Sequence, residues 1–208
     1  MKFLIIANGP FLAKDALLKA SNGKTILALD GAVDKLVAMG ITPNIVLGDF
    51  DSIRDKKVYA NDHLIKVVFK PDQNANDLQK AIAYAREHGA NEIDILCATG
   101  GRMDHTLRNI RALRDLSPEY FSITMRLHTE SETLEYVRDK KIILRGKKDD
   151  YCGIFAFPHG SFTSSGLKYN GKNFPLEFGV SEGSSNQFAE EIVEIVVTGE
   201  ALVVYPSA

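Results

Sequence analysis

The 208-residue chain lacks tryptophan, has only two cysteines, and contains neither a long apolar run nor an excess of one charge. Cys97 and Cys152 each lie in an apolar stretch, so we interpret both as small buried hydrophobic residues rather than a disulfide or a metal-binding pair. This use of cysteine fits a reducing compartment. No apolar segment approaches the roughly 20 residues that cross a bilayer. We therefore expect a soluble, cytoplasmic protein that does not engage a membrane.

The near balance of charge excludes a general attraction to nucleic acid or to an anionic membrane. Lysine and arginine total 25 against 27 aspartate and glutamate residues, which gives a net charge of −2. An anionic substrate would therefore need a local site, and a metal ion is the simplest means of providing one. Apolar residues make up 45% of the chain, enough for a substantial core. The apolar N-terminus, Met1–Ala7, is short and is interrupted by Asn8-Gly9-Pro10, which indicates a first core strand rather than a signal peptide.

The first half of the chain alternates strand and helix patterns. Apolar runs predict strands at Phe3–Ala7, Thr25–Leu29, Ile45–Leu47, Lys66–Phe69, Ile93–Ala98 and Phe121–Leu127. Apolar residues at helical spacing predict helices at Ala32–Met39, Leu78–His88 and His105–Leu116, the last with Leu107, Ile110, Leu113 and Leu116 inward. This alternation predicts an α/β fold with a doubly wound, mostly parallel sheet and helices on both faces. In such sheets ligands bind beyond the carboxyl ends of the strands.

The second half contains short strand patterns separated by turn residues and no long helix pattern. Strands are predicted at Leu134–Val137, Lys141–Leu144, Tyr151–Phe157, Gly166–Tyr169, Pro175–Phe178, Glu191–Val197 and Ala201–Tyr205, the last two as a hairpin. These patterns predict a small antiparallel β sandwich or roll. We therefore divide the chain into an α/β domain, residues 1–130, and a β domain, residues 131–208.

The motif Gly48-Asp49-Phe50-Asp51-Ser52 follows a buried strand pattern and is the strongest chemical signal in the chain. Residues two apart in a strand point the same way, so Asp49 and Asp51 are expected to project together. Two adjacent carboxylates repel unless a cation lies between them, and oxygen ligands suit Mg²⁺. An Asp-rich turn that caps backbone amides is the alternative interpretation.

Three further polar clusters follow predicted strands in the same half. They are Asp30-Gly31-Ala32, the segment from Asp72 to Asp77, and Thr99-Gly100-Gly101-Arg102-Met103-Asp104-His105. Each has a local explanation as a helix cap or tight turn. Four acidic loops on one rim are harder to explain by capping alone. The chain has neither a Walker P-loop nor a convincing Rossmann glycine pattern, so a carboxylate-held Mg²⁺ site for a nucleotide polyphosphate is the best chemical interpretation.

Taken in order along the chain, these motifs resemble the thiamin pyrophosphokinase family. The resemblance rests on Asp30-Gly31-Ala32, Gly48–Ser52, Asp72-Gln73 with Asp77, and Gly100–Thr106, with weaker matches at Gly166–Tyr169 and Gly183–Gln187. It implies transfer of the pyrophosphoryl group of ATP to thiamin, with release of AMP. It also implies a homodimer in which the thiamin site lies between the α/β domain of one subunit and the β domain of the other.

The resemblance assigns roles to individual residues of this chain. Asp49, Asp51 and Asp77 would hold Mg²⁺ and, with Arg102 and Asp104, form the catalytic set. The residues expected to bind ATP are Asp30, Gln73, Gly100, Gly101, Arg102, His105 and Thr106. Ser185 and Asn186 would contact thiamin from the partner subunit, and Phe188 is a candidate aromatic wall because the chain has no tryptophan.

One departure from the family pattern keeps other functions open. Asn74-Ala75-Asn76-Asp77 stands where the family often has Asp-x-Thr-Asp, so one carboxylate and one hydroxyl are missing. A pyrophosphokinase acting on another alcohol, such as a hydroxymethylpterin, is the nearest alternative. A non-catalytic sensor of nucleotide or thiamin diphosphate is the second alternative.

Overall fold

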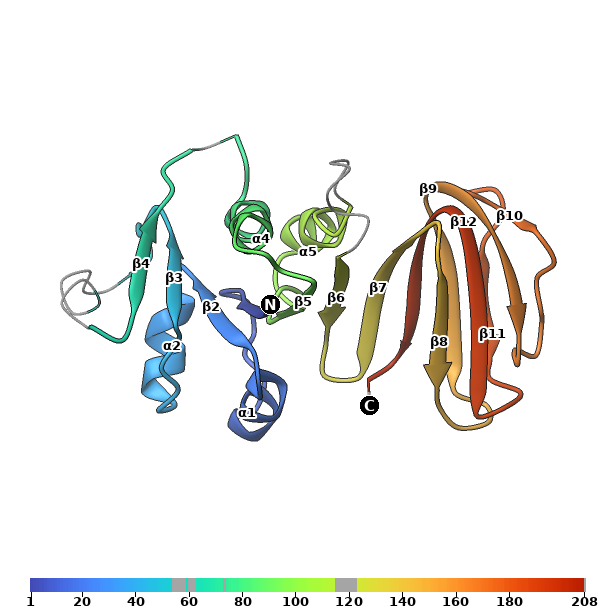
Figure 1. Ribbon diagram of the computed structural model, residues 1–208, viewed down its shortest axis with the longest axis horizontal. Helices are drawn as coiled ribbons and strands as arrows, with labels where there is room; N and C mark the ends of the chain where they lie inside the picture. The colour runs from blue at the N-terminus through green and yellow to red at the C-terminus, as the bar shows by residue number, and fades with distance from the viewer. Residues whose placement is uncertain (54–58, 60–62, 73, 115–122, 208) are drawn as a thin grey trace. The chain divides into compact units, whose positions relative to one another are not determined.

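The computed structural model describes residues 1–53, 59, 63–72, 74–114 and 123–207, and divides the chain into two compact units (Figure 1). The first is Met1–Thr129 and the second is Glu130–Ala208. Among the helices described there, none is long and apolar enough to cross a membrane.

The first unit contains a parallel sheet, as predicted. Its strands are β1 (Lys2–Ile6), β2 (Thr25–Leu29), β3 (Ile45–Gly48), β4 (Lys66–Phe69), β5 (Glu92–Leu96) and β6 (Thr124–His128). Their order is β6-β5-β1-β2-β3-β4, with Ile5 of β1 opposite both Leu27 of β2 and Ile95 of β5. The central strands are buried on both faces, which explains why they appear in the sequence as unbroken apolar runs rather than as alternating patterns.

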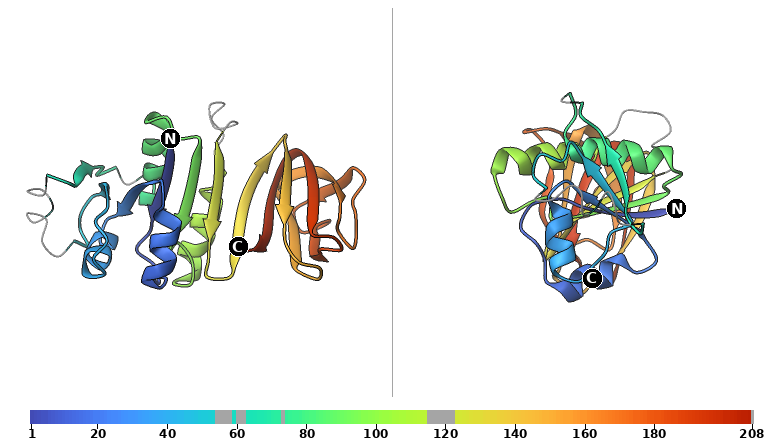
Figure 2. Two further views of the ribbon diagram at one scale, coloured as in Figure 1. Left: turned by 60° about the horizontal axis from the view of Figure 1, so that its bottom comes forward. Right: turned by 90° about the vertical axis from the view of Figure 1, so that its left-hand side faces the viewer.

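Helices cover both faces of this sheet. They are α1 (Lys14–Ser21), α2 (Ala32–Ala38), α4 (Asp77–Glu87) and α5 (Met103–Arg111). Figures 1 and 2 show α1 and α2 on one face and α4 and α5 on the other. The sequence patterns predicted α2, α4 and α5 but not α1, in which Leu17 is the only buried residue. The prediction that Leu107 faces inward is wrong, because its side chain is 53% exposed, whereas Leu113 is fully buried just beyond α5. Leu116 lies outside the described residues.

The second unit is antiparallel. Its strands are β7 (Glu132–Arg138), β8 (Lys141–Arg145), β9 (Tyr151–Ser165), β10 (Phe174–Glu177), β11 (Gly183–Gln187) and β12 (Ile192–Pro206). The long strand β12 pairs with β9 along most of its length, with β8 through its first half and with β7 through its second half. Its inward side chains, among them Val193, Ile195 and Val203, are fully buried in the core of this unit.

Two strand predictions in this unit are wrong. The predicted hairpin of Glu191–Val197 and Ala201–Tyr205 is one continuous strand, β12. Gly199 has a φ of 79° and lies where the register between β12 and β9 shifts, so it forms a bulge rather than a turn. The predicted strand Gly166–Tyr169 is a turn region that contains only an isolated bridge from Leu167 to Phe188.

Candidate functional site

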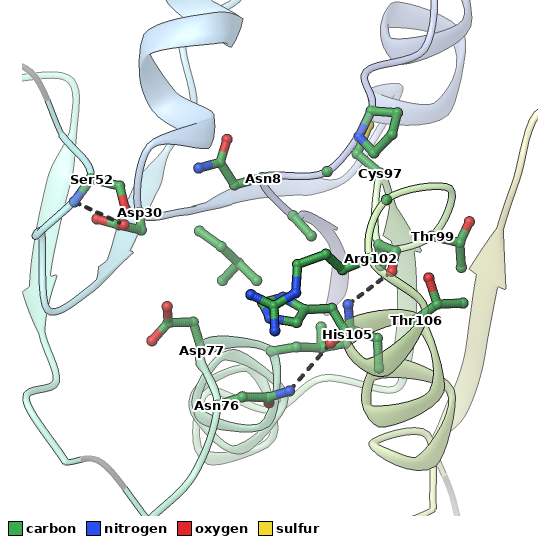
Figure 3. A pocket seen from close by; sticks show the side chains of 18 of the residues that line it. Asn8, Asp30, Ser52, Asn76, Asp77, Cys97, Thr99, Arg102, His105 and Thr106 are labelled. Atoms are coloured by element: carbon green, nitrogen blue, oxygen red, sulfur yellow. Dashed lines mark hydrogen bonds between the residues drawn. The ribbon is translucent and has the colours of Figure 1, made fainter.

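The loops at the carboxyl edge of the parallel sheet enclose a cavity of about 670 Å³ (Figure 3). The segments that follow β1, β2, β3 and β5 contribute to its wall, together with the start of α4. They meet because the carboxyl ends of parallel strands lie at one edge of a sheet. The predicted site residues that line the cavity are Asp30, Asp49, Asp51, Asp77, Gly101, Arg102, His105 and Thr106.

Three carboxylates form a cluster on one wall of the cavity. Each of Asp30, Asp49 and Asp51 offers an oxygen, and the three oxygens lie within 4.8 Å of one another. Asp30 is only 6% exposed, and its Oδ2 accepts a hydrogen bond from the backbone N–H of Ser52 at 3.2 Å. Its Oδ1 is buried and has no hydrogen-bond partner among the residues that the structure describes. A buried carboxylate oxygen without a donor, beside two other carboxylates, fits a divalent cation with oxygen ligands.

Burial and a like charge both act on Asp30. Burial raises the pKa of the Asp30 carboxyl above its ordinary value, and the nearby charge of Asp51 raises it further, whereas hydrogen bonds from Ser52 and the backbone of Gly31 act in the opposite direction. A cation bound by the cluster would relieve both unfavourable effects. The electrostatics of the cluster therefore agree with its geometry.

The two aspartates of the Gly48–Ser52 motif come together by a different route from the one that strand alternation predicts. Strand β3 ends at Gly48, and Phe50 adopts a left-handed φ of 64°. The Phe50 side chain is buried against the ring of Phe69, at a centroid distance of 5.8 Å, and anchors this unusual turn. Asp49 Oδ1 also accepts a hydrogen bond from the N–H of Asp51 at 3.3 Å, so the loop has some of the capping character considered as the alternative.

Asp77 lines the same cavity but does not belong to the cluster. It is the first residue of α4, and Figure 3 shows it beside Asn76. Its Oδ1 accepts a hydrogen bond at 3.0 Å from the ammonium of Lys80, which is almost fully buried and also donates to the carbonyl of Lys70. The structure thus groups Asp49 and Asp51 with Asp30 and places Asp77 in an ion pair.

The two asparagines that depart from the family pattern have local partners. Asn74 donates to Asp72 Oδ1 from its backbone N–H and from its side chain, both at 2.9 Å. Asn76 caps α4, because its Oδ1 accepts from the N–H of Gln79 at 2.8 Å. Gln73, predicted to bind ATP, lies outside the described residues.

Arg102 and Asp104 form a two-point ion pair at the start of α5. Arg102 Nε donates to Asp104 Oδ1 at 3.1 Å, and its Nη2 donates to Oδ2 at 2.6 Å. This hydrogen bonding lowers the pKa of Asp104 to about 2. Arg102 lines the cavity, whereas Asp104 and Gly100 are not among the lining residues. The carboxylate of Asp104 therefore holds the guanidinium that faces the cavity.

The sequence analysis missed Lys35 and Asn109 as cavity residues, and it assigned no binding role to Asn8 or Thr99, which also line the cavity. Lys35 Nζ donates to the carbonyls of Asn8 and Gly9, both at 3.1 Å, and so supplies a second positive charge to the wall. No pattern marks Lys35, because it lies in an ordinary amphipathic helix. For the segment after β1, the turn sequence Asn8-Gly9-Pro10 was the signal available. The structure shows that this position needs glycine, because a Cβ on Gly9 would approach the carbonyl oxygen of Cys97 to 2.3 Å.

A second, smaller cavity of about 230 Å³ lies in the β unit. Aromatic, glycine and polar residues line it: Phe162, Tyr169, Asn170, Gly171, Phe174, Glu182, Gly183, Ser184 and Asn186. The side chain of Asn186 accepts from the N–H of Tyr169 at 3.1 Å and donates to the carbonyl of the same residue at 2.7 Å. Ser185 is exposed with a left-handed φ of 58° and is not among the lining residues.

Phe188 does not serve as an aromatic wall, contrary to the prediction. Its ring is 2% exposed and belongs to the core of the β unit. A Cβ on Gly146 would approach this ring to 2.9 Å, which shows how closely it is packed. The exposed rings beside the second cavity are those of Tyr169 and Phe174, at 66% and 39% exposure.

Two family descriptions match the chain. Residues 17–125 match "Thiamin pyrophosphokinase, catalytic domain", and residues 139–202 match "Thiamin pyrophosphokinase, vitamin B1 binding domain". The first match includes the acidic cluster and most of the large cavity, and the second includes the Ser185-Asn186 turn.

Relatives from plants and animals show similar sequences. Thiamine pyrophosphokinase 3 of Oryza sativa subsp. japonica is 29% identical over 179 residues, which cover 76% of this chain and 63% of that protein. Thiamin pyrophosphokinase 1 of Caenorhabditis elegans is 30% identical over 182 residues, which cover 80% of this chain and 72% of that protein. The chain spans less than two thirds of the length of two rice relatives that it matches, 63% and 64%.

Solved structures share the fold. Thiamine pyrophosphokinase from Bacillus subtilis superposes with a TM-score of 0.82 at 23% identity, covering 100% of this chain and 99% of that one. Thiamin pyrophosphokinase from Candida albicans gives a TM-score of 0.83 at 20% identity, covering 100% and 90%. At these identities the superpositions establish the architecture.

Proposed function

Because the chain belongs to the thiamin pyrophosphokinase family, we propose that it transfers the pyrophosphoryl group of ATP to the hydroxyl of thiamin, giving thiamin diphosphate and AMP. One observation carries the proposal at the level of chemistry. In the large cavity, Asp30 Oδ1, which has no hydrogen-bond partner within the described part of the chain, lies beside the carboxylates of Asp49 and Asp51. This arrangement suits a divalent cation, and a cation held by carboxylates is a common means of binding a polyphosphate.

Asp30, Asp49 and Asp51 would hold Mg²⁺, and the prediction that Asp77 also holds it remains open to test. When bound, the ion would neutralise charge on the phosphates of ATP. The chemistry of the cluster supports this assignment, because every atom that its three carboxylates offer to a metal ion is an oxygen. If Asp77 also holds the ion, it would do so from the start of α4, where the ammonium of Lys80 fixes its carboxylate.

The positive side chains of the cavity would orient the polyphosphate. Arg102, held by Asp104, would bind a phosphate oxygen through its remaining N–H groups, and Lys35 would add a second positive charge. The thiamin hydroxyl oxygen would bond to the β-phosphorus in line with the departing oxygen of AMP, and the hydroxyl proton would be released. Positioning and charge stabilisation would supply most of the acceleration, as in phosphoryl transfer generally.

The β unit would supply the thiamin site, within a homodimer whose partner completes the active site. The second cavity supports this assignment, because Tyr169 and Phe174 offer aromatic faces and Glu182 offers a carboxylate to a ring that carries a positive charge. Asn186 would act by fixing the backbone of Tyr169, since its side-chain amide is already hydrogen-bonded there. Ser185 remains a predicted direct contact.

The decisive experiment incubates the protein with ATP, Mg²⁺ and thiamin and measures AMP and thiamin diphosphate. We expect the two products in equal amounts, and loss of activity on the order of 100-fold or more in Asp49→Asn and Asp51→Asn. Asp15→Asn is the control, because Asp15 is an exposed carboxylate on α1 that does not line the cavity. It should retain the parent activity.

Other outcomes would redirect the assignment. AMP formation with a hydroxymethylpterin but not with thiamin would support the alternative alcohol. Ligand binding without AMP release would support a sensor. Full activity in both aspartate variants, with unchanged folding by circular dichroism, would contradict the proposed metal cluster.

A further inference from the structure

Two asparagine side chains connect three segments of the large cavity that are distant in sequence. Asn109 Nδ2 donates to the carbonyl of Ala98, just beyond β5, at 2.8 Å. Asn109 Oδ1 accepts a hydrogen bond from Asn76 Nδ2, at the start of α4, at 3.2 Å. Asn76, Ala98 and Asn109 all line the cavity, and Figure 3 shows the dashed bond that leaves Asn76.

The bridge depends on both ends of the Asn76 amide. Its oxygen is used by the cap of α4, where it accepts from the N–H of Gln79, and Gln79 Oε1 accepts in return from the N–H of Asn76. Only the amide nitrogen is then left to reach Asn109. An aspartate at position 76 would cap the helix equally well but would have no N–H to donate at neutral pH.

The bridge joins the parts of the cavity that carry its opposite charges. Asn76 directly precedes Asp77 at the start of α4. Asn109 lies on α5, whose first turn follows Arg102, and it also holds the carbonyl of Ala98 in the segment that leads to Thr99 and Gly101. Asn109 lies near the end of α5, so the two amides tie the acidic start of α4 to that helix and to the Ala98 segment that leads into the Arg102 loop.

We propose that Asn76 and Asn109 form a positioning pair that fixes the start of α4 relative to the Arg102 loop for catalysis. The proposal rests on the proposed pyrophosphoryl transfer and concerns residues that touch neither reacting atom. Both helix starts face the cavity that would hold the polyphosphate, and small displacements of groups around a reacting phosphorus lower its reactivity steeply. The pair should act on turnover more than on stability.

The test compares Asn76→Asp, Asn109→Leu and the double variant. Asn76→Asp removes the bridging donor and keeps the helix cap, so its melting temperature should stay within a few degrees of the parent. We expect kcat to fall about tenfold in each single variant, and the KM for thiamin to be unchanged. The double variant should lose no more than Asn109→Leu alone, because Asn109→Leu already breaks the hydrogen bond that Asn76→Asp removes, together with the bond to the Ala98 carbonyl.

Gln79→Ala is the matched control. It removes the other half of the capping box and leaves the bridge from Asn76 to Asn109 in place. It should lower stability by as much as Asn76→Asp or more while kcat stays at the parent value. A kcat that falls in Gln79→Ala in proportion to stability would show that the effect is merely structural and would overturn the proposal.

Two further outcomes separate this proposal from the proposed function. If the parent turns over thiamin and both single variants keep its kcat, or if their losses multiply in the double variant, the positioning pair is wrong and the function stands.

If the parent binds ATP with Mg²⁺ but forms no AMP, the function fails. Titration of ATP then tests the pair with Asn109→Leu, which adds no charge to the cavity. Binding about tenfold weaker than that of the parent is expected, and unchanged binding would contradict the pair. Absence of ATP binding by the parent would overturn both.

Discussion

At the scale of one residue, Asp30 is unfavourable for the fold but suited to the proposed metal site. Its carboxylate is buried, one oxygen has no donor among the described residues, and Asp51 adds a like charge. A group in this setting weakens the folded state unless something positive binds it. The fold therefore gives no reason for a carboxylate at position 30, whereas the proposed metal site does.

We predict that Asp30→Asn stabilises the metal-free protein. The folded-state pKa of Asp30 is raised, so the parent loses stability as the pH rises from the unfolded pKa of about 3.9 through the folded value. The asparagine variant should lack this loss and melt at a higher temperature in EDTA near pH 7. Added Mg²⁺ should raise the melting temperature of the parent alone. A variant that melts lower than the parent in EDTA would argue against the unfavourable burial of this charge.

Asp94 on β5 is the opposite case, a buried carboxylate that is fully paired. Burial alone would raise its pKa, but hydrogen bonds from His128 and Lys24 bring the pKa down to about 2. The His128 Nε2 atom lies 2.8 Å from Asp94 Oδ1, and Lys24 contacts the other oxygen. These contacts stabilise the fold outside the cavity, since none of the three residues lines it.

We predict that this pairing contributes stability that is present above about pH 3.9 and is lost as the pH falls through about 2. The depressed pKa corresponds to about 2 kcal/mol. Asp94→Asn should lose about this much at pH 7, measured by urea unfolding, and should flatten the acid limb between pH 4 and pH 2. Asp15→Asn, at an exposed carboxylate on α1, is the control and should keep the limb. An unchanged limb in Asp94→Asn would contradict the assignment.

Among the elements, β12 illustrates how one glycine changes the meaning of a sequence pattern. Thr198-Gly199-Glu200 has the composition of a turn, yet the chain continues as a strand and changes its neighbour from β8 to β7. A Cβ on Gly199 would approach the Cα of Gly160 to 2.9 Å, so the two strands pass unusually close at the bulge. The N–H of Gly199 is held by Asp139 Oδ1 at 2.7 Å.

Gly199→Ala should therefore cost roughly 2–4 kcal/mol of unfolding free energy, because a positive φ and a close contact both oppose a side chain. Gly179→Ala provides the comparison. Gly179 has a similar φ of 72°, against 79° for Gly199, but nothing lies within 4 Å of its added Cβ, so only the backbone term of about 1 kcal/mol applies. Chemical denaturation of both variants measures the difference. Equal losses would show that the close strand contact is not important.

For the whole molecule, the proposed chemistry is divided between two units. The acidic cluster belongs to Met1–Thr129, and the aromatic cavity belongs to Glu130–Ala208. If each active site combines the α/β unit of one subunit with the β unit of another, a defect in one unit can be complemented by a subunit with a defect in the other.

We predict such complementation between Asp49→Asn and Tyr169→Ala. Each variant alone should be inactive or nearly so, whereas subunits mixed after reversible dissociation should recover up to about a quarter of the parent activity, because random pairing builds one intact site in half of the dimers. Light scattering should give about twice the chain mass of 22.9 kDa. Mixed subunits that stay inactive while forming dimers would indicate that each site is built from one chain.

The sequence by itself determined the elements that depend on local periodicity. The buried runs predicted the parallel strands, and Ala32–Met39 and Leu78–His88 predicted α2 and α4, because apolar spacing and helix-ending glycines act over a few residues. The acidic loops also followed from the sequence, because each comes directly after a predicted strand. The order of these strands placed their carboxyl ends on one rim, so most of the predicted site residues reached the same cavity.

The tertiary structure alone decided which of those residues touch. It grouped Asp30 with Asp49 and Asp51, tied Asp77 to Lys80, and buried Phe188 in the core. It also added Lys35 and Asn109, which no motif marks. These outcomes depend on packing between segments far apart in the chain, on a left-handed turn at Phe50 and on burial that shifts a pKa. None of these is encoded in the spacing of neighbouring residues.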